Sequence, residues 1–81
     1  MFVKQLGTNR YGIYADEAFR LRVGTAERLE REWYFQAEAK YGGKWAFGVT
    51  MADAVEQTGA FALVRAEDRI ASRRMANKQP S

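Results

Sequence analysis

The chain has 81 residues, of which 47% are hydrophobic, 14% aromatic and 28% charged, with a net charge of +3. This length accommodates one domain, which buries only about 60 to 65% of the surface that the unfolded chain exposes, and the composition is typical of a folded protein. Cysteine and histidine are absent, which excludes disulfides, thiol nucleophiles, the commonest general base and the commonest metal ligand. We therefore expect a protein that is not an enzyme and that needs no cofactor or metal ion.

The sequence also gives no indication of a membrane segment. Its first residues lack a basic stretch followed by a long apolar run, and no segment approaches the ~20 apolar residues that span a bilayer. A cytoplasmic protein without a membrane partner is the expectation.

The first part of the chain is typical of short strands. Residues 2–6 and 10–14 contain aromatic and β-branched side chains and are separated by turn residues at 7–9. Within residues 18–24 apolar side chains alternate with arginine, which indicates a strand with one wet face. A short helix ending at Gly24 is the alternative.

The middle of the chain predicts a helix followed by a hairpin. Residues 25–31 are rich in helix formers, and Thr25 could cap them. The aromatic runs at 32–41 and 44–49 flank Gly42-Gly43, which favours a two-residue type I′ turn because that turn needs positive φ at both central residues.

Alternation within this hairpin separates its aromatic rings into two sets. Trp33 and Phe35 fall on the dry face of the predicted sheet. Regular pairing puts Trp45 on the wetter face with Tyr34, and Phe47 shares a face with Trp45.

The last third of the chain begins with a clear helix signal. Thr50 and Asp53 have the spacing of a capping box and Gly59 is a C-terminal stop, so we expect a helix over 51–58. Residues 60–65 are interpreted as another strand. The remainder is either a partner strand or a short helix capped by Asp68, with residues 75–81 as a mobile basic tail.

These elements predict a small single α+β domain over residues 1–74. Its sheet is mainly antiparallel, with five or six short strands, and one or two helices pack on one face.

The charges are unevenly distributed along the chain. Residues 1–64 carry eight basic and eight acidic side chains, so the whole net charge falls on residues 65–81. The acidic pairs at 16–17 and 67–68 are expected to be solvated turn charges, and Glu27, Glu30 and Glu38 to form ion pairs with nearby arginines rather than a metal site.

The favoured hypothesis is a non-enzymatic binding protein that blocks or recruits a protein or nucleoprotein partner through one sheet face and the basic C-terminal segment. In size and composition the chain is comparable to phage and plasmid accessory proteins, among them inhibitors of host defence. An open edge strand would also allow a homodimer. The expected partner-binding residues are Arg22, Tyr34, Tyr41, Lys44 and Trp45.

The alternative is a direct nucleic-acid-binding module, in which basic side chains contact phosphates and rings of the hairpin stack on bases. The expected phosphate contacts are Arg65, Arg69, Arg73, Arg74 and Lys78. Against both hypotheses stands the simpler interpretation that every ring belongs to the core of a small domain and that the basic residues serve solubility.

Overall fold

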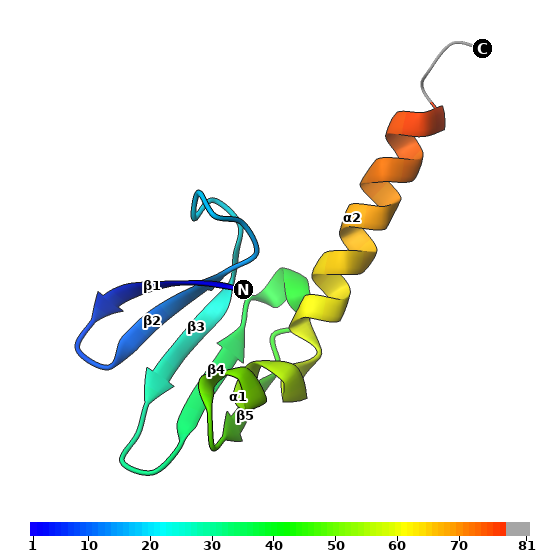
Figure 1. Ribbon diagram of the computed structural model, residues 1–81. Coiled ribbons are helices and arrows are strands. Elements are labelled where there is room, and N and C mark those ends of the chain that lie inside the picture. Colours follow the sequence, from blue (N-terminus) through cyan, green and yellow to red (C-terminus); the bar gives the residue numbers. More distant parts are fainter. Residues whose placement is uncertain (78–81) are drawn as a thin grey trace.

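The computed structural model describes residues 1–77, and the side chains of residues 1–68 (Figure 1). Five antiparallel strands form one sheet in the order β1-β2-β3-β4-β5. The predicted single α+β domain is confirmed, with five strands and two α-helices within residues 1–77. The strands are β1 (Phe2–Gly7), β2 (Arg10–Tyr14), β3 (Arg22–Arg28), β4 (Trp33–Ala37) and β5 (Trp45–Gly48), and the helices are α1 (Met51–Thr58), α2 (Ala60–Asn77) and the short 3₁₀ helix η1 (Ala39–Tyr41).

The first hairpin is confirmed, with Asn9 in the left-handed region at φ 59° in its turn. The third strand begins later than predicted, because residues 15–21 form a loop closed around Asp16. The Asp16 carboxylate accepts hydrogen bonds from the backbone N–H groups of Arg20 and Leu21, and Phe19 has a positive φ of 57°. These donors hold the pKa of Asp16 below its ordinary value.

The predicted helix at 25–31 is wrong, because residues 25–28 continue β3 in the middle of the sheet and residues 29–31 lie in the connection from β3 to β4. Ala26 lies between Tyr11 of β2 and Phe35 of β4 and is buried. Two neighbouring strands satisfy the backbone of β3, and its inner face is buried in the core between the sheet and the helices. Together these outweigh a propensity difference of a few tenths of a kcal/mol per residue.

The two-residue turn at Gly42-Gly43 is also wrong, although both glycines have positive φ as expected. Strand β4 ends at Ala37, and η1 intervenes before β5. The longer connection turns Tyr41 into the core, where it is fully buried. A hydrophobic ring on this segment thus gains more by burial than it would beside Lys44 in a tight turn.

The helix over 51–58 is confirmed with both of its caps. The Thr50 hydroxyl accepts from the Asp53 N–H at 3.1 Å, and Gly59 ends α1 with a φ of 69°.

The strand predicted at 60–65, and the helix start at Asp68, are wrong because α2 begins at Ala60. The buried Thr58 hydroxyl donates to the carbonyl of Val55 and accepts from the N–H of Ala60, so it links the two helices. Helix α2 reaches Asn77, three residues into the segment expected to be a tail, and residues 78–81 lie outside the described part of the chain.

Both helices lie on one side of the sheet, which we call the inner face (Figure 1). Helix α1 crosses β4 and β5, and among the described side chains of α2, which extend to Asp68, the buried ones are Ala60 and Val64. The rest of α2 projects away from the body, so the molecule measures 57 × 22 × 18 Å. The core between the two layers is formed by Ile13, Val23, Ala26, Phe35, Ala37, Tyr41, Ala54, Val55, Ala60 and Val64.

Candidate functional site

The opposite side of the sheet, which we call the outer face, carries three aromatic rings in mutual contact. Tyr34 of β4 lies 5.2 Å from Phe47 and 6.2 Å from Trp45, and the rings of the latter two are 5.7 Å apart between centroids. We call these three residues the aromatic cluster. Trp45 is 60% exposed and Phe47 is 42% exposed, so much of the cluster faces solvent.

Strand register explains why these rings meet. Tyr34 is paired with Phe47 and Gln36 with Trp45 across β4 and β5, and directly paired side chains of antiparallel strands lie on the same face. The hydroxyl of Tyr34 donates to the Gln36 side chain at 3.2 Å. The alternating residues Phe35 and Ala37 point into the core, so β4 has one row of buried side chains and one row of exposed side chains.

Charged side chains of both signs lie next to the aromatic cluster on the outer face. Arg10 is paired with Glu27, and Glu27 in turn with Tyr34. Arg22 forms an ion pair with Glu38 at 2.5 Å. Because acids and bases alternate here, the central part of the outer face has little net charge.

A second pair of rings lies nearer β1 on the outer face. The Tyr14 ring covers Gly12, where an added Cβ would come within 2.7 Å of it, and packs edge-on against Phe19 at 5.2 Å. The ammonium group of Lys4 lies 5.7 Å from the Phe19 ring. Tyr14 is buried by this arrangement, so these rings shield each other and expose less surface than the aromatic cluster does.

The structure brings together three of the residues predicted for partner binding. Tyr34, Trp45 and Arg22 share the outer face, and Lys44 is exposed next to Trp45. Tyr41 is in the core instead, because η1 replaces the expected tight turn, and it is not part of this surface. Phe47 was not among the predicted site residues, although its spacing of two from Trp45 already placed it on the same face.

The basic residues predicted for phosphate contacts lie on α2. Arg65 is exposed on the helix side of the molecule, where it lines a groove, and is therefore not on the face that carries the aromatic cluster. The backbone of α2 includes Arg69, Arg73 and Arg74, whose side chains lie outside the described part, as does all of Lys78.

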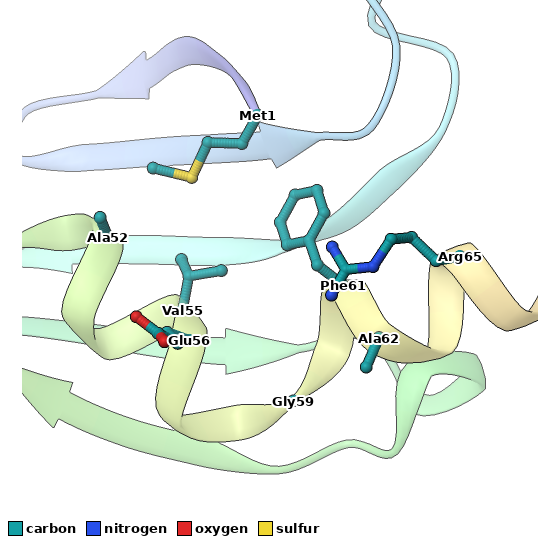
Figure 2. A pocket seen from close by; sticks show the side chains of 8 residues that line it. All are labelled: Met1, Ala52, Val55, Glu56, Gly59, Phe61, Ala62 and Arg65. Atoms are coloured by element: carbon teal, nitrogen blue, oxygen red, sulfur yellow. The ribbon is translucent and has the colours of Figure 1, made fainter.

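The groove that Arg65 lines lies between the start of β1 and the two helices (Figure 2). Met1 lies on one side of it, with Val55 of α1 and Phe61 of α2 across from Met1. Its volume is about 460 Å³, and its lining is mainly apolar, with Glu56 and Arg65 as the charged members.

Within the described residues, no three acidic side chains lie close enough together to hold a metal ion. No helix in that part of the chain has the length and apolar character needed to cross a membrane. Of the acidic residues considered earlier, Asp16 binds loop N–H groups and Glu38 pairs with Arg22. The expected turn at Glu67 and Asp68 is wrong, because both residues lie within α2. No protein-family model, curated protein or solved structure matches this chain.

Proposed function

We propose that this chain is a binding protein that blocks or recruits a protein partner through the outer face of its sheet. The observation that carries the proposal is the aromatic cluster, exposed on a face that neither helix covers. Tryptophan, tyrosine and phenylalanine are enriched in the buried centres of protein interfaces, where they supply much of the binding energy.

The surroundings of the cluster favour a protein over a nucleic acid. Arg22 is neutralised by Glu38, and Arg10 faces Glu27. Phosphate backbones require a surplus of positive charge, whereas protein interfaces use mixed charges at their rims. A mixed rim around a ring cluster is the pattern expected for a protein contact.

The residue composition also suits a protein that acts by occupying the surface of its partner. Binding a partner requires neither a nucleophile nor a general base, and the chain has no histidine or cysteine. Inhibition of a host-defence complex by a mobile-element accessory protein would be one such role.

Direct nucleic-acid binding is the second candidate, favoured by Lys44 next to Trp45. Exposed rings on an antiparallel sheet can stack on bases of single strands, and a neighbouring ammonium group can contact phosphate. The basic surplus of residues 65–81 would add charge.

The test compares Trp45→Ala with Leu63→Ala. Both side chains are large, apolar and exposed, at 60% and 46%, but Leu63 lies on α2 and not on the outer face. Each variant and wild type are first used to capture proteins from the producing cells. A protein that co-purifies with wild type and with Leu63→Ala, but not with Trp45→Ala, is then purified and titrated with all three. We expect Trp45→Ala to weaken this affinity by about 30-fold, equivalent to a hot spot of about 2 kcal/mol.

Two outcomes would count against this proposal. Equal loss of partners in both variants would mean that the aromatic cluster is not the contact surface. Salt-sensitive quenching of tryptophan fluorescence by single-stranded DNA or RNA, abolished in Lys44→Glu, would instead support the second candidate.

A further inference from the structure

The edge strand β1 has one side without a neighbour. It pairs with β2 only, and all six of its residues are exposed. Its outward N–H and C=O groups therefore have no strand partner among the described residues, and such a row is a template for another strand.

The side chains of this edge are unusually apolar. Phe2, Val3 and Leu6 are 41 to 43% exposed and the adjacent Met1 is 52% exposed. Lys4 is the only charge in β1, which contains no proline. Sheet edges in natural proteins are normally protected by several charges, by proline or by a covering element. The opposite edge, β5, has four residues where β1 has six.

The helix layer also stops short of β1. The groove of Figure 2 separates Met1 from α1 and α2, so the inner side of β1 has open space where Val55 and Phe61 face it. A strand added beside β1 would find room there for its inward side chains.

We propose that β1 pairs with β1 of a second copy of this chain, in antiparallel orientation about a two-fold axis at Val3. The two sheets would then form one continuous sheet with all four α-helices on the same face. This inference concerns an edge distant from the aromatic cluster on β4 and β5, and it does not depend on the proposed function.

Symmetry and charge limit the register, and Val3 is favoured over Gln5 because the pairing of β1 becomes irregular after Gln5. In an antiparallel pair related by a two-fold axis, one residue must face its own copy. An axis at Lys4 would bring two ammonium groups together, which is unfavourable. An axis at Val3 places the apolar Val3 side chains opposite each other and sets each Lys4 opposite Phe2 of the second copy.

The first test measures mass against concentration for two matched valine variants. Sedimentation velocity from about 1 µM to about 1 mM covers the range of weak, strand-mediated association. We expect wild type and Val49→Lys to shift from monomer to dimer, and Val3→Lys to stay monomeric. Val49 is 80% exposed at the other edge of the sheet, so it controls for the added charge. A monomeric wild type at every concentration, or dimers that persist in Val3→Lys, would overturn the proposal.

The second test reports the register without relying on a disruptive change. The chain has no cysteine, so single Val3→Cys and Val49→Cys variants each carry one thiol. Facing residues of antiparallel strands have Cβ atoms about 4.5 to 5.5 Å apart, close enough for a disulfide after a small adjustment. Under mild oxidation we expect rapid crosslinking of Val3→Cys and not of Val49→Cys. Equal crosslinking of the two would show random collision and overturn the assigned register.

Discussion

Replacing Gly48 with alanine tests how closely α1 approaches the sheet. Gly48 ends β5 directly beneath α1, and a Cβ at this position would lie 2.4 Å from the backbone nitrogen of Ala54 and 2.9 Å from the Cβ of Asp53. Neither obstacle can rotate away, because one is the backbone of the helix and the other is attached directly to it. The helix would have to move outward as a whole.

The size of the effect follows from what that movement separates. Ala54 and Val55, exposed by 0% and 4%, are the buried side chains by which α1 contacts the core. Overpacking of this kind typically costs about 1 to 3 kcal/mol, and the upper part of the range applies because backbone must shift. At about 4 to 8 °C per kcal/mol for a domain of this size, we expect Gly48→Ala to lower Tm by about 10 to 20 °C.

Thermal unfolding followed by circular dichroism measures this difference, with two other glycines as controls. Gly7 has no atom within 4 Å of an added Cβ, so Gly7→Ala should change Tm by less than about 3 °C. Gly59 is equally open but has a φ of 69°, and its alanine variant should lose about 1 kcal/mol from backbone strain alone. A wild-type Tm for Gly48→Ala would refute the close contact of α1 with β5.

Four further variants test individual side chains. The buried Tyr41 hydroxyl has no hydrogen-bond partner among the described residues, so Tyr41→Phe should be as stable as wild type or up to about 1 kcal/mol more stable in urea unfolding; a clear loss would reveal a partner. Phe35→Ala should lose about 3 to 5 kcal/mol and Trp45→Ala less than about 1 kcal/mol, because the first ring is fully buried and the second is 60% exposed. The pKa of Asp16 is lower in the folded protein than its ordinary value of 3.8, so its carboxylate stabilises the fold at pH values above 3.8. This stabilisation is lost as the pH falls through the pKa of the folded state. Wild type should therefore exceed Asp16→Asn in Tm at neutral pH and converge with it in acid, and a constant difference would contradict this.

The sequence predicted best those features that depend on neighbouring residues alone. The Thr50 cap and the Gly59 stop define α1 through contacts within one turn of the helix, and both are present. Likewise, the alternation of side chains in residues 33–37 correctly placed Phe35 inside and Tyr34 outside. This prediction needs only the knowledge that one face of the strand is buried, because successive side chains point to opposite faces.

Features that depend on distant segments were missed. Nothing within residues 25–31 shows that Tyr11 and Phe35 will flank Ala26, so local helix propensity misled the prediction for β3. The apolar run at the start of residues 60–65 is too short to distinguish a buried strand from a helix by periodicity, and it proved to be the anchored start of α2. The burial of Tyr41 depended on the same long-range packing, and for that reason one of the predicted contact residues proved to be core.

The projecting part of α2 has a consequence for how the mass of this protein is measured in solution. The longest dimension of the molecule, 57 Å, is more than twice each of the other two, 22 and 18 Å. The radius of gyration is 14.7 Å, whereas a compact chain of this length has about 12 Å. An elongated particle experiences more friction than a sphere of equal mass, so a single copy will elute early from a size-exclusion column calibrated with globular standards. Light scattering or a sedimentation analysis that fits the frictional ratio distinguishes this shape effect from a second copy joined at β1.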